Sequence, residues 1–146
     1  MDARNVCAWQ YEGEYAVYNI SGWETVVSQH WGIADEDIRG REFYALRDER
    51  DMLVGFFRLH EQEDSLLLSL GLAPLCCGIG MGKTAMALII AEARRKAPDK
   101  QLELEVRAFN KRAIVCYQRC GFTAIETYFK ETPVGNDTFI RMVLEA

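Results

Sequence analysis

The sequence lacks an excess of basic residues. Its 146 residues include 17 lysines and arginines against 22 aspartates and glutamates, which gives a net charge of −5. A protein that binds nucleic acid through its phosphates needs surplus positive charge to neutralise them. The composition therefore disfavours nucleic acid as a partner.

Long apolar runs are also missing. The longest, residues 66–79, is interrupted by a serine, a proline and two glycines. It is shorter than the roughly 20 residues that a bilayer-spanning helix requires. The N-terminal residues 1–5 lack the basic-then-apolar order of a secretory signal. We therefore expect no membrane partner and a cytoplasmic location.

The cysteines do not suggest a disulfide framework. There are five, an odd number, and Cys76 and Cys77 are adjacent, which is unfavourable for a bridge. Cys116 and Cys120 lie four residues apart with no histidine or third cysteine nearby, so they make a poor zinc site. We expect reduced, mostly buried thiols and no metal.

The length suits one domain over residues 1–146, because two independent cores would need a longer chain. In the first half, alternation predicts a strand within residues 5–20 with a turn at 12–14. A weak helical pattern follows over residues 21–38, with Ser21 and Glu24 placed as a capping box. Three strands then form a predicted antiparallel meander, at residues 42–46, 52–59 and 65–72.

The second half alternates helices and strands. Apolar spacing predicts a helix over residues 83–96, and Leu102, Leu104 and Val106 give the next strand one apolar face. Asn110 can cap a helix that runs to Cys120, and Gly121 suits its C-terminal end. Two closing strands are predicted at residues 122–130 and 138–144. The pattern as a whole indicates an α+β fold with a mostly antiparallel sheet.

A glycine-rich segment connects the third strand of the meander to the helix. Gly78, Gly80 and Gly82 let main-chain N–H groups approach an anion at a helix N-terminus, and Lys83 adds a full charge. A tight turn that only needs glycine torsions explains the segment equally well.

Two familiar phosphate-binding motifs do not fit this segment. Cys77 replaces the first glycine of a P-loop, and no later strand ends in a magnesium-binding aspartate. The dinucleotide fingerprint G-x-G-x-x-G fails because its third glycine comes one residue early.

A third motif fits better. The run Cys77-Gly78-Ile79-Gly80-Met81-Gly82 resembles the motif [QR]-x-x-G-x-[GA] of the GNAT superfamily, the acetyl-CoA-dependent N-acetyltransferases. Downstream, Asn110, Ala113, Tyr117 and Gly121-Phe122 reproduce that family's N-x-x-A-x-x-x-Y-x-x-x-G-F. Residues 104–107 resemble the preceding strand of the protein N-terminal alanine acetyltransferases. The resemblance covers about residues 52–144, and Cys77 departs from its glutamine or arginine position.

The resemblance implies a GNAT-like fold in which the fourth and fifth strands are parallel and splayed, and acetyl-CoA as cosubstrate. Main-chain N–H groups of the glycine loop would bind its pyrophosphate, so Cys77 is expected to weaken binding without abolishing it. The implied coenzyme-binding residues are Leu70, Gly71, Leu72, Cys77, Gly78, Ile79, Gly80, Met81, Gly82, Lys83, Asn110, Ala113 and Tyr117. Main-chain groups of the first three are expected to be free to hold pantetheine and polarise the carbonyl.

Acetyl transfer to an amine needs a general base, an oxyanion donor and a general acid for the thiolate. By resemblance Tyr117 is the acid, although it could instead anchor its helix in the core. Glu105 is the first choice for the base, because it corresponds to a glutamate of the N-terminal alanine acetyltransferases. Alternation alone makes Glu105 part of a solvated strand face. A water chain to Glu61, Glu63 or Asp64 would serve equally well.

The acceptor is expected to be a primary amine of a small molecule or of a protein N-terminus. The charge of −5 slightly favours a cationic acceptor, and family members shape this site with the half of the chain that holds Trp9, Tyr11, Tyr15, Trp23 and Trp31. Two alternatives remain open, a non-catalytic acyl-CoA-binding module and a degenerate P-loop nucleotide binder. Family habit also allows a homodimer.

Overall fold

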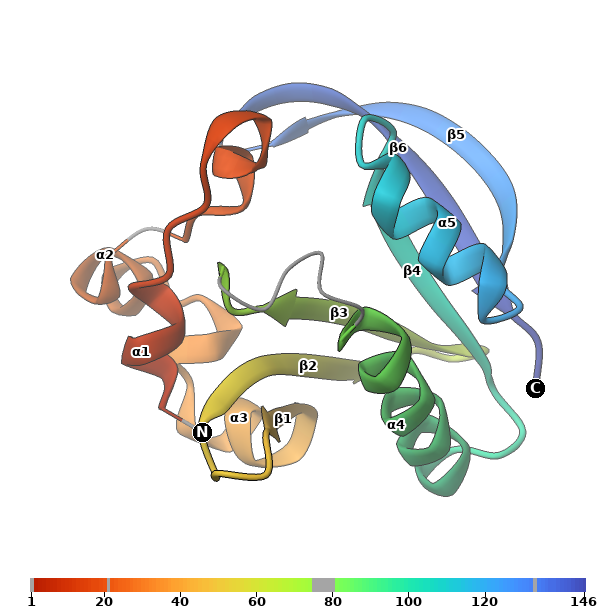
Figure 1. The fold of residues 1–146 in the computed structure, drawn as a ribbon, viewed down its shortest axis with the longest axis horizontal. Coiled ribbons are helices and arrows are strands. Elements are labelled where there is room, and N and C mark those ends of the chain that lie inside the picture. The colour runs from red at the N-terminus through yellow and green to blue at the C-terminus, as the bar shows by residue number, and fades with distance from the viewer. Residues whose placement is uncertain (1, 21, 75–80, 133) are drawn as a thin grey trace. The chain divides into compact units, whose positions relative to one another are not determined.

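Six strands form one mixed sheet in the computed structural model, which describes residues 2–20, 22–74, 81–132 and 134–146 (Figure 1). The strand order is β1-β2-β3-β4-β6-β5. Strands β3 and β4 pair in parallel, whereas β1–β2, β4–β6 and β5–β6 are antiparallel. The strands are β1 Phe43–Arg47, β2 Leu53–Glu61, β3 Ser65–Leu72, β4 Gln101–Arg107, β5 Thr123–Thr132 and β6 Gly135–Leu144.

Helices accompany the sheet, as the α+β prediction requires. The α-helices are α1 Ala3–Cys7, α2 Trp23–Ser28, α3 Glu36–Glu42, α4 Met81–Lys96 and α5 Lys111–Arg119, and the 3₁₀ helices are η1 Gly13–Tyr18 and η2 Gly32–Ala34. None of the helices in the described part of the chain is long and apolar enough to cross a bilayer.

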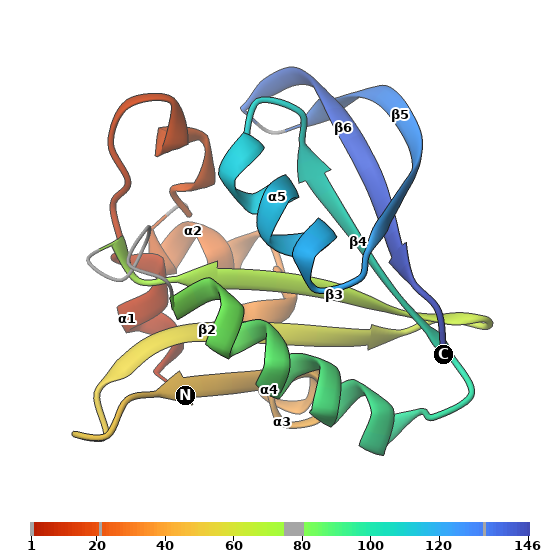
Figure 2. The same cartoon turned by 45° about the vertical axis from the view of Figure 1, so that its right-hand side comes forward.

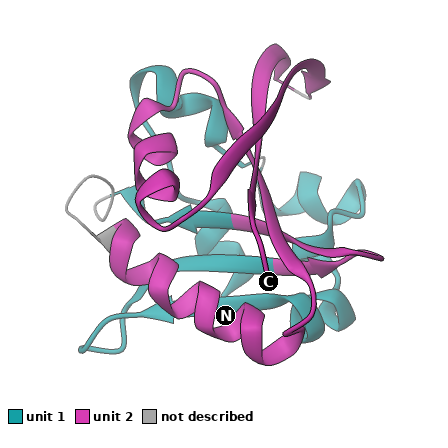
Figure 3. Cartoon of the chain, turned by 90° about the vertical axis from the view of Figure 1, so that its right-hand side faces the viewer, with its two compact units in different colours: residues 1–58, 70–77 teal, residues 59–69, 78–146 magenta. Residues whose placement is uncertain are grey.

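The contacts divide the chain into two compact units (Figure 3). Unit 1 consists of residues 1–58 and 70–77, and unit 2 of residues 59–69 and 78–146. Strands β2 and β3 each contribute residues to both units.

In unit 1, the prediction of a strand within residues 5–20 is wrong. The Asp2 carboxylate accepts hydrogen bonds from the main-chain N–H groups of Arg4 and Asn5, so it caps α1. Helical spacing then buries Ala3, Val6 and Cys7. The aromatic alternation that suggested a strand continues into η1, whose first residue, Gly13, has a φ of +61°.

The helix predicted over residues 21–38 is broken in two. Helix α2 ends at Ser28, and His30 follows with a left-handed φ of 56°. The Asp35 side chain then accepts a hydrogen bond from the Ile38 N–H at 3.0 Å and so begins α3. The capping box on Ser21 lies outside the described residues, and Gly22 is the N-cap of α2.

The meander is confirmed. Its third strand has the predicted bounds, and its first two are displaced by one or two residues. Gly55 and Gly71 permit close packing between β2 and the end of β3 within unit 1. A Cβ at Gly55 would lie 2.8 Å from the Gly71 carbonyl oxygen, and one at Gly71 would collide with the ring of Phe56.

Unit 2 follows the predicted order of helix, strand, helix and two strands (Figure 2). Helix α4 begins two residues before the predicted start. The apolar faces of α4 and β4 are buried, and this core holds Ala85, Met86, Ile89, Ala93, Leu102, Leu104 and Val106. Gly121 ends the α5 segment with a φ of +102°, as its predicted role requires.

Candidate active site

The site centres on the part of β4 that extends beyond its parallel partner. The pairing of β3 with β4 runs from Ser65–Gln101 to Leu68–Leu104. Residues 105–107 continue only against β6 within the described chain. Among the described residues, Glu105 is therefore the first of β4 whose β3-facing edge has no strand pairing.

Glu105 is held by two side chains from β5. Its carboxylate accepts a hydrogen bond from the Tyr128 hydroxyl and forms an ion pair with the Lys130 ammonium. About a third of the Glu105 side chain is exposed. Glu105 is thus accessible to solvent, as the alternation predicted, but its carboxylate is paired within a polar cluster on the sheet face.

The hydroxyl of Tyr128 stays a donor in this cluster. Burial raises the pKa of Tyr128 above its ordinary value, and the hydrogen bond to Glu105 and the negative charge of that carboxylate raise it further. The phenol therefore remains protonated and holds one oxygen of the Glu105 carboxylate, while Lys130 neutralises its charge.

The register of β4, β6 and β5 places further charged side chains on the same sheet face. Arg141 lies between Glu105 and Glu126 in the strand pairing, and its guanidinium contacts Glu103 at 3.0 Å and Glu126 at 3.4 Å. Because residues opposite one another on neighbouring strands share a face, these contacts follow from the register. The face is a network of paired charges.

A buried cation lies at the end of β4. Arg107 is 8% exposed, donates a hydrogen bond to Asp137 at 2.9 Å and places its guanidinium 4.8 Å from the centre of the Phe139 ring. The hydrogen bond from Arg107 is the main cause that lowers the pKa of Asp137, and a hydrogen bond from the Thr138 N–H adds to it. Asp137 therefore stays charged and neutralises Arg107.

Helix α5 carries the downstream motif. The Asn110 side chain accepts a hydrogen bond from the Ala113 N–H at 3.3 Å, so its predicted role as N-cap is confirmed. Tyr117 is partly buried, and its ring lies 6.0 Å from the ring of Phe122 in a tilted arrangement. Tyr117 thus helps to anchor the helix, which is compatible with a catalytic role for its hydroxyl.

Only the end of the glycine loop lies within the described residues. Cys77, Gly78, Ile79 and Gly80 fall outside them, and Met81 begins α4.

The next two residues of α4 lie on its first turn. A Cβ at Gly82 would lie 3.5 Å from the Cys116 sulfur, which is ordinary van der Waals contact, and Gly82 has no positive φ. The fold alone therefore does not demand glycine at position 82. Lys83 is exposed, so its amine is accessible to an anion.

The end of β3, in unit 1, is partly engaged within the chain. The Tyr11 hydroxyl donates a hydrogen bond to the Leu72 carbonyl at 2.5 Å. This contact corrects the expectation that the main-chain groups of Leu70, Gly71 and Leu72 are all free. Glycine at position 71 has a packing reason, since a side chain there would collide with Phe56. Coenzyme binding by these three residues stays a prediction.

The alternative carboxylates lie around the turn between β2 and β3. Glu61 forms an ion pair with Lys100 at 2.9 Å, and the hydrogen bond from Lys100 is the main cause that lowers the pKa of Glu61. Glu63 and Asp64 are exposed. Within the described ranges, no three histidine, cysteine or acidic side chains come together as a metal site would require.

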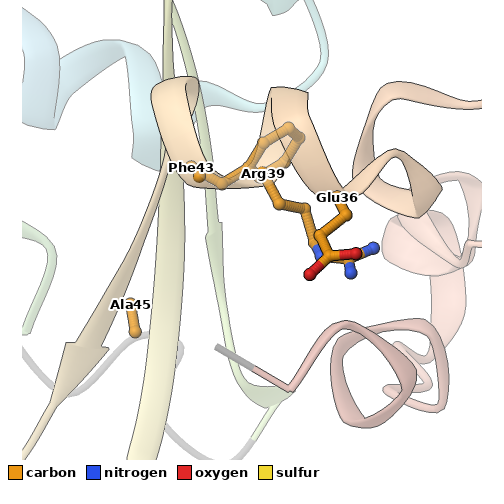
Figure 4. A pocket seen from close by; sticks show the side chains of 5 residues that line it. Glu36, Arg39, Phe43 and Ala45 are labelled. Carbon is orange, nitrogen blue, oxygen red and sulfur yellow. The ribbon is translucent and has the colours of Figure 1, made fainter.

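Unit 1 contains the aromatic residues that were expected to shape the acceptor site. Trp9, Trp23 and Trp31 pack against its buried core of Ala3, Val6, Cys7, Val26 and Ile33. A nearby open hollow of about 320 Å³ lies between α3 and β1 (Figure 4) and is lined by Glu36, Arg39, Gly40, Phe43 and Ala45. Arg39 donates to the Ile33 carbonyl at 2.8 Å, so this cation is held by the unit's own main chain.

Tyr128 and Lys130 are the site residues that sequence patterns alone did not identify. Both lie in the penultimate predicted strand, two residues apart and therefore on one face. The alternation was visible in the sequence. The strand register that brings this face to Glu105 was not visible in the sequence, because it depends on the hairpin between β5 and β6 and on the pairing of β6 with β4.

Comparisons with known proteins agree with this architecture. The model of a family described as "Acetyltransferase (GNAT) family" matches residues 4–122. The structure of the spermidine/spermine N-acetyltransferase SpeG from Vibrio cholerae in complex with manganese ions is 17% identical, covers 98% of this chain and 86% of that chain, and gives a TM-score of 0.73. The structure of a putative phosphinothricin N-acetyltransferase is 14% identical, covers 70% of each chain and gives a TM-score of 0.63.

The structural similarities establish the fold, and the family model adds a match in sequence. No curated protein matches this sequence. The family match covers more than half of the chain and includes β3, α4, β4 and α5, the elements that carry both motifs. The chain therefore belongs to the acetyltransferase (GNAT) family.

Proposed function

We propose that this chain is a single-domain enzyme that transfers the acetyl group of acetyl-CoA to a primary amine of a small molecule or of a protein N-terminus. The observation that carries the proposal is the position of Glu105. Its carboxylate stands just beyond the parallel pairing of β4 and is already in contact with an amine and a hydroxyl. A general base must lie within hydrogen-bond reach of the proton that it removes, and Glu105 already contacts a primary ammonium in this way.

The coenzyme would bind along the elements that carry the two motifs. Main-chain N–H groups of residues 77–83 at the start of α4 would hold the pyrophosphate. For pantetheine, the residues expected to make contact are Asn110, Ala113 and Tyr117 in unit 2 and the main chain of residues 70–72 in unit 1. The carbonyl of Leu72 is already used by Tyr11, so the other main-chain groups of this segment would serve the coenzyme.

Three groups would share the chemistry. Glu105 takes a proton from the acceptor ammonium, and the free amine adds to the thioester carbonyl. A main-chain N–H near Leu70, Gly71 or Leu72 stabilises the oxyanion. Tyr117 gives its proton to the departing thiolate.

A polyamine is a candidate acceptor among small amines. The net charge of −5 favours a cationic acceptor, and the structures similar in fold include spermidine N-acetyltransferases. One of these is described as dodecameric. A homodimer and a cytoplasmic location stay predictions for this chain.

The runner-up is an acyl-CoA-binding module without turnover. Cys77 lacks the side-chain hydrogen bonds of glutamine or arginine, and the proposed base is already paired with Lys130. The degenerate P-loop alternative predicts magnesium-dependent affinity for ATP and none for CoA.

An acceptor screen tests the proposal. Thiol release from acetyl-CoA is followed with polyamines, aminoglycosides, amino acids and N-terminal peptides, and mass spectrometry identifies the acetylated product. We expect turnover with at least one class, and a loss of about 10²–10⁴-fold in kcat for Tyr117→Phe and Glu105→Gln, the usual contribution of a general acid or base. Binding of acetyl-CoA without turnover on any amine would favour the binding module.

A further inference from the structure

The Lys130 ammonium occupies a cation site next to the proposed base. Its Nζ contacts the Glu105 carboxylate and lies 4.7 Å from the centre of the Phe139 ring. A carboxylate and an aromatic face together attract an ammonium group. The Tyr128 ring is stacked beside Phe139 at 6.2 Å, and its hydroxyl holds the same carboxylate. The site is therefore organised around one primary ammonium.

This ammonium has the chemistry of the acceptor. A primary amine must reach Glu105 before that carboxylate can remove its proton, and the Lys130 amine is already there. Its side chain is 40% exposed, so it is accessible to a reactant. A reacting group held in place by its own chain needs no bimolecular encounter with an acceptor.

We propose that the enzyme acetylates its own Lys130 from bound acetyl-CoA. This inference rests on the proposed function, because it uses Glu105 as the general base and the coenzyme as acetyl donor. It makes Lys130 a modification site and the first acceptor that the active site meets.

The reaction balances with the groups named. Glu105 takes one proton from the Lys130 ammonium and passes it to water. The nitrogen lone pair then forms a bond to the thioester carbonyl carbon, and the carbon–sulfur bond breaks. Tyr117 protonates the departing thiolate and regains a proton from the acylated nitrogen, so the products are N-acetyllysine, free coenzyme thiol and one released proton.

The modification would change the site that it occupies. An acetylated lysine carries no charge, so the ion pair between residue 130 and Glu105 is lost. The carboxylate is then available to an external ammonium. Acetylation of Lys130 thereby lets an external acceptor ammonium pair with Glu105.

Lys100 provides a matched control within the same unit. It also forms an ammonium–carboxylate pair, with Glu61 at 2.9 Å, but it lies immediately before β4, at the other end of that strand. The Lys100 side chain is 24% exposed and the Lys130 side chain 40%, so chemical acetylation should modify the two at rates of the same order. Acetylation by the active site would select Lys130.

The experiment incubates the purified chain with acetyl-CoA alone and follows each lysine by peptide mass spectrometry. We expect one acetyl group on Lys130, added at a rate that does not depend on protein concentration, with Lys100 modified far more slowly. Glu105→Gln should slow the modification of Lys130 by about a hundredfold or more. Lys130→Arg keeps the positive charge and should remain unmodified, and the urea unfolding midpoints of both variants verify that they fold.

The outcomes separate this inference from the proposed function. If an external amine were acetylated while Lys130 stayed unmodified, the self-acetylation alone would be overturned. If neither an external amine nor Lys130 were acetylated, both the self-acetylation and the proposed function would be overturned. Equal modification of Lys130 and Lys100, or an unchanged rate in Glu105→Gln, would show chemical acetylation and also overturn it. A rate that rises with protein concentration would indicate transfer between copies and contradict the intramolecular step.

Discussion

The packing of Gly71 against Phe56 leads to a quantitative prediction. A Cβ at position 71 would collide with Cε1 of the Phe56 ring and approach its Cζ and Cδ1 to 3.0 and 3.1 Å. The ring is not free to withdraw, because Trp9 and Phe43 lie against it with ring centres 6.3 and 6.2 Å away. Overpacking of this kind costs about 1–3 kcal/mol. Gly71→Ala should therefore lower the free energy of unfolding by that amount.

The assay is urea or thermal unfolding of the full chain. For a chain of this size each kcal/mol corresponds to roughly 2–4 °C in Tm, so the decrease is measurable. Phe56→Leu removes the obstructing ring, and the double variant with Gly71→Ala should be more stable than the sum of the single effects predicts. Neighbouring sites of this kind couple by about 0.5–3 kcal/mol.

Gly55 supplies the matched control. A Cβ there would lie 2.8 Å from the Gly71 carbonyl oxygen, a main-chain atom that no side-chain truncation moves. Gly55→Ala should therefore destabilise the chain and show no rescue by Phe56→Leu. If Gly71→Ala left stability unchanged and weakened only acetyl-CoA binding, the packing explanation would be refuted and glycine at 71 would serve the coenzyme.

Three further predictions concern unit 2. Asn110→Ala removes the N-cap of α5 and should lower unfolding stability by about 0.5–2 kcal/mol, whereas Asn110→Asp should retain most of it. Gly82→Ala should raise stability by about 0.4–1 kcal/mol, because the added Cβ only touches Cys116 without strain; a loss of stability would contradict this packing of α4 beside α5. The contact with Arg107 lowers the pKa of Asp137 in the folded chain. The ionised Asp137 carboxylate therefore contributes its full stabilisation at pH values above its pKa in the unfolded chain, about 3.9, and this stabilisation is lost as the pH falls through its lowered pKa in the folded chain. The urea midpoint should therefore depend less steeply on acid pH in Asp137→Asn.

Local patterns predicted unit 2 well. Apolar spacing indicated α4, alternation indicated β4, and Asn110 and Gly121 marked the ends of α5. These signals work because caps, positive φ angles and side-chain periodicity act over a few residues.

The N-terminal part was predicted less well, because signals that act over a few residues do not decide its structure. Alternating aromatics in residues 9–18 imitate a strand, although Asp2 caps a helix just before them. Whether such a segment pairs as a strand depends on a partner that is distant in sequence. The tertiary core of unit 1 instead packs Trp9 beside a helical turn.

The family motifs, the order of most elements and the candidacy of Glu105 and Tyr117 all follow from the amino-acid order. The side chains that surround Glu105 do not follow from the amino-acid order. Only the pairing of β5 with β6 and of β6 with β4 brings Tyr128 and Lys130 to Glu105. Helical periodicity and caps are encoded in neighbouring residues, whereas the register of strands far apart in the chain is set by the packing of the whole sheet.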